Sequence, residues 1–309
     1  MKLIKNFFLP LLVCSLILVS CKKTQKFTFA GGFKGGTYYK IGQSLDSLSE
    51  FEAKVLPTNG SVDNLYLVSD AKAKYSLTQL DMLRRTSIGQ DEVSKNVRVI
   101  MPVYSEEIHM LVRKEITDIE NLKSKTISIG PANSGMKNTA LTFLDQAGVN
   151  QDNTTFEELA TEKAIPKLLT GELDGVVVIA GVPVKILQEI PAKEKENIHL
   201  IDFAGKVYQS VVGTSQYYQK AEIQADTYPW QSKIVKTLVV QSVLITHSKT
   251  EQKDIEFLLD GIFDNKISLS TKHIKWDKIS KKAIQNSFEI NKDIYHPAMA
   301  KILPKFVKK

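Results

Sequence analysis

The chain of 309 residues has few cysteines and few arginines. Its two cysteines, Cys14 and Cys21, fall at the N-terminus, so the rest of the chain has neither a disulfide nor a cysteine-based metal site. Stability must then come from an apolar core, for which a chain of this length is ample. The four arginines are scattered, so anion binding would depend on lysine or on backbone N–H groups; they are Arg84, Arg85, Arg98 and Arg113.

The sequence also lacks an apolar run long enough to cross a bilayer, which takes about 20 residues. The longest, residues 7–19, is interrupted by Pro10 and follows the basic residues Lys2 and Lys5. It ends in Leu-Val-Ser followed by Cys21, which is typical of a lipoprotein signal.

We therefore predict a signal peptide over residues 1–20 and a lipidated tether over residues 21–26 that begins at Cys21. This places the protein in the cell envelope, as a membrane-anchored lipoprotein facing the periplasm or the cell exterior. Beyond the lipid on Cys21 we expect no other membrane anchor.

Strand-like and helix-like runs alternate along the rest of the chain, which predicts an α/β fold. Strands are expected over residues 26–30, 126–130 and 176–180. Helices are expected from residue 62, with Ser61 as N-cap, and over residues 136–147, closed by Gly148.

A chain of this size is expected to form two lobes. Two apolar strand candidates, residues 108–112 and 238–246, are placed to cross between them. Lobe 1 would then comprise residues 27–113 and 237–309, and lobe 2 residues 114–236. Such lobes leave a cleft that can close over a small ligand.

A glycine-rich loop follows the first predicted strand. Residues 31–36 contain four glycines, but Gly36 is followed by Thr37 and Tyr38, which does not fit a Walker loop. Ala30 stands where a dinucleotide-binding loop has glycine, so we expect no nucleotide cofactor. Taken alone, the loop fits a plain tight turn better than a binding site.

Three further loops place glycine and hydroxyl or amide residues between a strand and a helix: residues 58–64, 130–137 and 180–183. Helix N-termini carry unpaired N–H groups and partial positive charge, so several of them at one cleft could bind a carboxylate without arginine. Each loop taken alone fits a capped helix without a ligand better than a binding site. Gln79 and Asp81 could belong to an exposed face or point at a ligand.

Catalytic and metal signals are weak. Ser134 and Lys137 match a Ser-x-x-Lys pattern, but its partner motifs are absent and the chain repeats the pattern at Ser69. The five histidines show no metal-ligand spacing, so no metal is expected. Five lysines between residues 272 and 282 fit a solvated face better than a membrane contact, and nucleic acid is not an expected partner.

Taken in order, the loop motifs resemble the TAXI-type substrate-binding receptors of tripartite ATP-independent periplasmic (TRAP) transporters. The resemblance covers nearly the whole chain after the signal. The motifs are Gly35-Gly36-Thr37-Tyr38-Tyr39, residues 59–65 (NGSVDNL), Gln79-Leu80-Asp81, residues 128–131 (SIGP) with Ser134-Gly135, residues 180–183 (AGVP) and Thr227-Tyr228-Pro229.

The resemblance implies a two-lobed periplasmic-binding-protein fold of type II-like form. It implies a non-enzymatic receptor that delivers a small carboxylate, such as glutamate, 2-oxoglutarate or a dicarboxylate, to a TRAP-type permease. The implied ligand-binding residues are Gly36, Thr37, Tyr38, Ser61, Asn64, Gln79, Asp81, Ser134, Gly135, Met136 and Gly181. Met136 departs from the family, which usually has threonine there, and this leaves the ligand open.

Two alternatives remain. One is a receptor of similar fold that serves an ATP-driven transporter or a sensor. The other is an extracytoplasmic serine hydrolase that uses Ser134 and Lys137.

Overall fold

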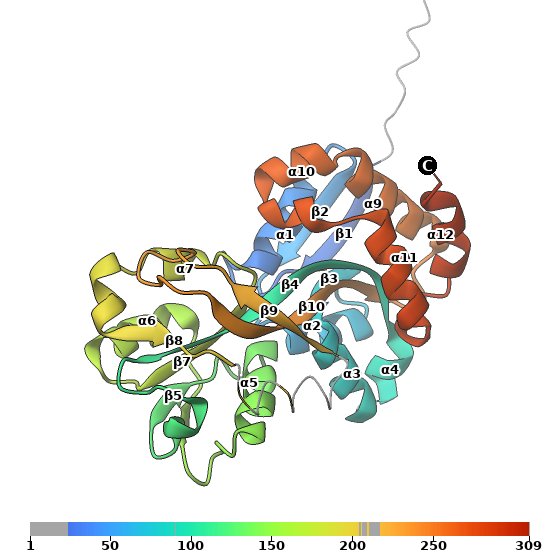
Figure 1. Cartoon of the computed structure of the whole chain (residues 1–309). Helices are drawn as coiled ribbons and strands as arrows, with labels where there is room; N and C mark the ends of the chain where they lie inside the picture. The colour runs from blue at the N-terminus through green and yellow to red at the C-terminus, as the bar shows by residue number, and fades with distance from the viewer. Residues whose placement is uncertain (1–23, 90, 204, 206–208, 210–216, 309) are drawn as a thin grey trace, which may run out of the picture.

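The computed structural model describes residues 24–308, except residues 90, 204, 206–208 and 210–216. The predicted signal peptide and Cys21 lie outside the described residues. Two groups of helices and strands lie next to each other and are joined by long strands (Figure 1).

The strands are β1 (Gln25–Ala30), β2 (Phe51–Leu56), β3 (Tyr75–Gln79), β4 (Val97–Arg113), β5 (Thr126–Ser128), β6 (Thr155–Glu157), β7 (Gly175–Ala180), β8 (Ile198–Leu200), β9 (Tyr218–Ile223) and β10 (Val235–His247). The α-helices are α1 (Thr37–Asp46), α2 (Ser61–Ser69), α3 (Leu80–Gly89), α4 (Asp91–Asn96), α5 (Gly135–Gln146), α6 (Thr161–Thr170), α7 (Lys185–Gln188), α9 (Gln252–Asp264), α10 (Lys266–Lys272), α11 (Lys281–Ile290) and α12 (Met299–Phe306). Short 3₁₀ helices are η1 (Ile119–Leu122), η2 (Ala192–Glu196), η3 (Ile274–Lys278) and η4 (Lys292–Ile294).

All ten strands belong to one mixed sheet. Its order is β2-β1-β3-β10-β4-β7-β5-β6, while β8 pairs with β4 and β9 pairs with β10. Parallel pairs form at both ends of this order, between β1, β2 and β3 and between β5, β6 and β7. The antiparallel strands β4 and β10 join the two parallel parts.

Each crossing strand changes partner partway along its length. β10 pairs with β9 through Val240 and with β3 from Ser242. β4 pairs with β7 from Glu107 onward. The predicted crossover strands are thus confirmed, and both are longer than expected because each contributes to the sheet on both sides.

The buried apolar residues form separate cores on the two sides of this junction. One core draws on residues 27–104 and 243–306, and we call this side lobe 1. Two smaller clusters draw on residues 108–240 and form lobe 2. The C-terminal helices α9, α10, α11 and α12 all lie on lobe 1 (Figure 1). The expected α/β, two-lobed fold is confirmed.

The start of α2 corrects one expectation. Its N-cap is Gly60, with a φ of 116°, and Ser61 is the first helical residue. A glycine adopts this backbone conformation without the steric cost that a side chain brings. The Ser61 hydroxyl contacts Gln79 instead, donating to Oε1 at 3.3 Å and accepting from the backbone N–H at 3.1 Å.

The predicted helix over residues 136–147 is α5, and its N-cap Ser134 accepts a hydrogen bond from the Lys137 N–H at 3.1 Å.

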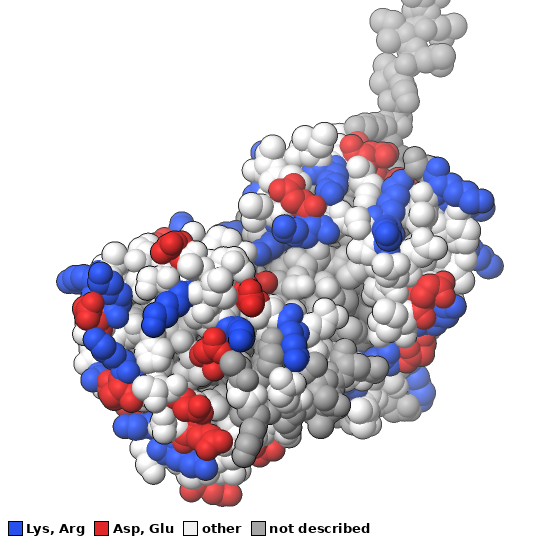
Figure 2. All heavy atoms as spheres, in the orientation of Figure 1, with Lys and Arg blue, Asp and Glu red and all other residues white. Residues whose placement is uncertain are grey.

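Among the helices of the described part of the chain, none is long and apolar enough to cross a membrane. On the face shown in Figure 2, basic and acidic side chains are interspersed over both lobes.

Candidate functional site

A cavity of about 580 Å³ lies between the two lobes. From lobe 1 it is bordered by the starts of α1 and α2, the end of β3, and residues 273–275. From lobe 2 it is bordered by the start of α5, residues 160–162, and residues 178–186. All four glycine-containing loops singled out in the sequence therefore reach one cleft.

Nine of the eleven predicted ligand-binding residues line this cavity: Gly36, Thr37, Tyr38, Ser61, Gln79, Ser134, Gly135, Met136 and Gly181. They come from both lobes and from segments far apart in sequence. Met136 places a thioether on the wall and packs over Gly130.

Four helices, α1, α2, α6 and α7, bring N-termini without a side-chain cap to the cavity, and two of them begin after a glycine. The N-caps of α1 and α2 are Gly36 and Gly60, and neither can supply a side-chain oxygen. Both residues line the cavity. Uncapped first-turn N–H groups and the partial positive charge of the helix end favour an anionic group there. At α5, by contrast, Ser134 already caps the helix.

Gly135 lets the two lobes approach each other at the start of α5. A Cβ atom at this position would lie 1.8 Å from Gln79 Oε1 and 2.9 Å from Ser61 Oγ. Any larger residue would therefore push α5 away from α2 and β3. The role of this glycine is to allow contact between the lobes.

Gly181 has a similar role toward Lys275, which lies on η3. A Cβ atom at Gly181 would meet Lys275 Nζ and Cε at 2.5 Å. The Lys275 ammonium donates a hydrogen bond to the Val182 carbonyl at 2.6 Å. Lys275 therefore does not belong to a solvated lysine face, as its sequence position suggests, but joins lobe 1 to the loop after β7.

The next residue, Trp276, fixes the position of η3 and thereby that of Lys275. The Trp276 side chain is fully buried and donates from Nε1 to Ser44 Oγ at 2.7 Å, which ties η3 to α1.

His273 also lines the cavity, and burial lowers its pKa to about 4, so it is neutral at pH 7.

Sequence reasoning missed two lining residues on β4, Tyr104 and Glu106. Both are buried, and burial raises the pKa of Glu106 to about 8. The sequence signal was the acidic pair Glu106 and Glu107 at the edge of an apolar strand, an unusual place for charge.

A hydrogen-bond chain fixes the loop after β7. The Val184 N–H donates to the Tyr228 hydroxyl at 3.2 Å, and Tyr228 lies 2.7 Å from His109 Nε2. His109 Nδ1 faces the carbonyls of Glu107 and Val178, so Nδ1 carries the proton and Nε2 accepts from Tyr228. Burial lowers the pKa of His109 to about 4, which keeps the ring neutral.

Asn64 and Asp81, the other two predicted residues, lie outside the cavity lining. Asn64 is fully buried, where it donates to the Leu77 carbonyl at 2.8 Å and accepts from Thr58 at 2.6 Å. Asp81 is fully buried between the lobes. Both side chains already have protein partners, so their placement gives them structural roles.

The hydrolase alternative requires the lysine amine to reach the serine hydroxyl. Instead, Ser134 Oγ donates to the Pro131 carbonyl at 2.7 Å and caps α5. The Lys137 ammonium pairs with Glu158 at 2.6 Å. The geometry therefore does not favour a Ser–Lys catalytic pair.

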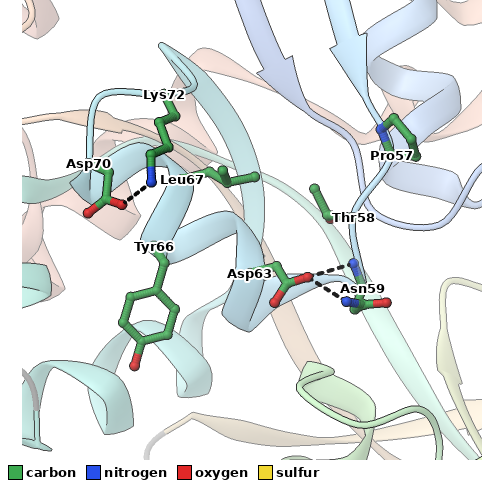
Figure 3. Close-up of a pocket in the computed structure, with 8 residues that line it drawn as sticks. All are labelled: Pro57, Thr58, Asn59, Asp63, Tyr66, Leu67, Asp70 and Lys72. Carbon is green, nitrogen blue, oxygen red and sulfur yellow. Dashed lines mark hydrogen bonds and ion pairs between the residues drawn. The ribbon is translucent and has the colours of Figure 1, made fainter.

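A second hollow, of about 470 Å³, lies beside α2 (Figure 3). Its charged groups already have partners within the hollow: Asp63 accepts two hydrogen bonds from Asn59, and Lys72 pairs with Asp70. The cleft between the lobes is the better candidate site.

Within the described residues, no group of three His, Cys, Asp or Glu side chains is placed to hold a metal ion.

The chain has the two-lobed fold of periplasmic binding proteins. It is similar to a periplasmic sulfonate-binding protein SsuA from Methylobacillus flagellatus KT, at 10% identity and a TM-score of 0.50, over 93% of this chain and 96% of that one. SsuA from Escherichia coli aligns at 11% identity and a TM-score of 0.49, over 93% and 79%. The GluR0 ligand-binding core from Nostoc punctiforme, in complex with L-glutamate, aligns at 15% identity and 0.47, over 81% and 98%.

A model of the NMT1-like family matches residues 29–299, so the chain belongs to the NMT1-like family. No curated protein matches the chain in sequence.

Proposed function

We propose that this protein is an extracytoplasmic solute-binding lipoprotein of the TAXI type. It captures a small organic anion between its lobes and delivers it to a TRAP-type permease. We set the lobe boundaries within the crossing strands, so that lobe 1 comprises residues 27–113 and 237–309 and lobe 2 residues 114–236. The apolar residues of β4 from Ile108 and of β10 up to Val240 nevertheless pack in the cores of lobe 2. Cys21 carries the lipid that holds the protein at the membrane, facing the periplasm or the cell exterior.

The observation that carries the proposal is the meeting of two uncapped helix N-termini, those of α1 and α2, at one cavity between the lobes. A carboxylate there would accept hydrogen bonds from first-turn N–H groups. Hydroxyl and amide groups of Thr37, Ser61 and Gln79 lie on the same wall and give the ligand further partners.

Closure of the lobes can also signal to the permease that a ligand is bound. Contacts at Gly135 and Lys275 join lobe 1 to lobe 2, so a ligand that bridges the cleft stabilises the closed arrangement. A permease can then distinguish loaded from empty receptor by shape.

A thermal-shift screen of residues 22–309, which contain the whole described fold, tests ligand capture. The screen compares small carboxylates with neutral analogues of equal size. A ligand at a hundred times its Kd adds about 2.7 kcal/mol of stability, enough to raise Tm by a few degrees. Saturable shifts from carboxylates alone support the proposal, and shifts from neutral compounds alone contradict the anion site.

Delivery and anchoring need separate tests. Uptake by the proposed permease should require an ion gradient and no ATP. ATP-dependent uptake would favour the second candidate, a receptor for an ATP-driven transporter, which is what the SsuA relatives' names describe. Metabolic labelling with a fatty acid should be lost in Cys21→Ser.

A further inference from the structure

Glu106 has a buried carboxyl group on the wall of the cleft that the protein does not fully satisfy. Its side chain is 4% exposed and lines the cavity. Among the residues that the structure describes, its Oε1 atom has no hydrogen-bond partner. A buried polar atom left unpaired costs about 1–3 kcal/mol. A ligand that enters the cavity can supply the missing partner.

Lys275 is a charge partner of Glu106, but its ammonium is held by another group. Glu107, the next residue, accepts a hydrogen bond from the Val182 N–H at 2.8 Å. The Lys275 ammonium donates to the carbonyl of the same Val182. The charge of Asp81, on α3, also raises the pKa of Glu106. The chain therefore sets two further carboxyl groups and one lysine around Glu106, and ionisation of Glu106 calls for one more positive charge.

Two aromatic rings lie beside the acid. Tyr38 and Tyr104 both line the cavity, and their ring centroids lie 6.4 Å apart in an edge-to-face arrangement. The hydroxyls of both tyrosines form hydrogen bonds with the Glu106 carboxyl, which lower its pKa. Aromatic faces attract cations, and Lys275 Nζ already lies 5.6 Å from the centroid of the Tyr104 ring. The Tyr38 ring and the Glu106 carboxyl then suit the ammonium group of a ligand.

Tyr38 also connects Glu106 to the anion site at the helix N-termini. Tyr38 is the second residue of α1, and its hydroxyl lies 3.5 Å from Ser61 Oγ at the start of α2. The Tyr38 side chain thus lies between Glu106 and the uncapped N-termini of α1 and α2. A ligand that occupies both places carries its positive and negative groups close together.

We propose that Glu106 binds the amino group of the ligand, and that the ligand is an amino carboxylate whose amine lies close to its carboxylate, as in an α-amino acid. This inference rests on the proposed function, because it assigns the second half of the same cleft. It separates amino acids from the dicarboxylates and oxo acids that the helix N-termini alone would accept.

Binding should also move a proton. Burial raises the pKa of Glu106 to about 8, with Asp81 and Glu107 acting in the same direction and the hydroxyls of Tyr38 and Tyr104 against it. The empty site at pH 7 thus holds the carboxyl protonated. A ligand ammonium keeps its own protons and favours the ionised carboxylate, so the Glu106 proton passes to the buffer.

The test uses matched pairs that differ only in the amine: L-glutamate and glutarate, L-leucine and 4-methylpentanoate, and L-phenylalanine and 3-phenylpropanoate. Affinities are measured by calorimetry at pH 7 on residues 22–309, in two buffers of different ionisation enthalpy. We expect at least one amine-bearing member to bind ten times more tightly than its partner. Its binding should release close to one proton.

Glu106→Gln should remove that preference and the proton release. Glu107→Gln is the matched control, because it removes a neighbouring charge while its amide oxygen can still accept from Val182. It should keep the preference.

The outcomes separate the two proposals. Amine-free carboxylates that bind wild type as tightly as the amino acids would leave the proposed function standing and overturn the role of Glu106. A preference that survives in Glu106→Gln would overturn it as well. If no member of any pair binds, the assignment of small carboxylates and that of their amine both fail.

Discussion

Asp81 of lobe 1 accepts a hydrogen bond from the Tyr218 hydroxyl of lobe 2 at 2.6 Å. The same carboxyl oxygen accepts from Thr139 of α5 at 2.7 Å, and the second oxygen accepts from the Met82 N–H at 2.8 Å. Asp81 is fully buried, and burial raises its pKa while these three hydrogen bonds lower it. One buried acid thus joins α3 to two elements of the opposite lobe.

Removal of one hydroxyl tests this junction. Tyr218→Phe should lower the free energy of unfolding by about 1–3 kcal/mol, because a buried acid loses a donor. Urea denaturation followed by circular dichroism measures the loss. Tyr66→Phe, at a tyrosine that is 41% exposed, is the control and should change stability by less than about 0.5 kcal/mol. Equal effects of the two substitutions would contradict a special role for Tyr218.

Gly135→Ala tests how closely the lobes must approach. The added methyl group would overlap Gln79 Oε1, so we expect the lobes to separate at a cost of about 1–3 kcal/mol. Ligand affinity should fall accordingly, and small-angle scattering should show a larger radius of gyration. Gly205→Ala is the control, since an added Cβ there meets no atom within 4 Å. Unchanged affinity in Gly135→Ala would show that closure tolerates the methyl group.

Asn64→Ala is predicted to act on stability and not on ligand contact. Loss of the buried amide leaves the Leu77 carbonyl and the Thr58 hydroxyl without their partner, at a cost of about 1–3 kcal/mol. Chemical denaturation measures this cost, and calorimetry on the folded protein should give an affinity within threefold of wild type. An affinity loss of tenfold with no change in stability would place Asn64 in the site after all.

Glu106 predicts a pH dependence of stability in the absence of ligand. Its folded pKa is raised to about 8, so its stabilising contribution is full below the unfolded pKa of about 4.3 and is lost as pH rises through 8. The contribution is on the order of a few kcal/mol. The free energy of unfolding should fall over this interval in wild type and less steeply in Glu106→Gln. Parallel pH profiles for the two proteins would count against the raised pKa.

Local patterns in the sequence predicted the loops of the cleft well. Gly36, Ser134 and Gly181 stand between a strand and a helix, where neighbours in the chain largely decide the backbone. The direction in which Asp81 points could not be predicted in this way. Its partners Thr139 and Tyr218 lie 58 and 137 residues away, and only the packing of α3 against lobe 2 brings them together.

Glu106 was missed for a related reason. An acid beside an apolar strand reads as the solvent-exposed end of that strand, because charge is rarely buried. Here β4 continues past it in both directions and both lobes cover it. The crossing strands themselves were predicted because their apolar residues form continuous runs, whereas their full lengths depend on partners in both lobes.

The position of β10 between β3 and β4 sets an order of events during synthesis. The sheet of lobe 1 stays divided until residues 242–247 have left the ribosome, since β10 is the strand that joins β3 to β4. The buried face of that lobe also waits for the C-terminal helices, which carry core residues as late as Phe306. Lobe 2, by contrast, is encoded in one uninterrupted stretch. A nascent chain therefore cannot complete its larger core early, and this delay would suit the proposed passage of the unfolded chain through a membrane.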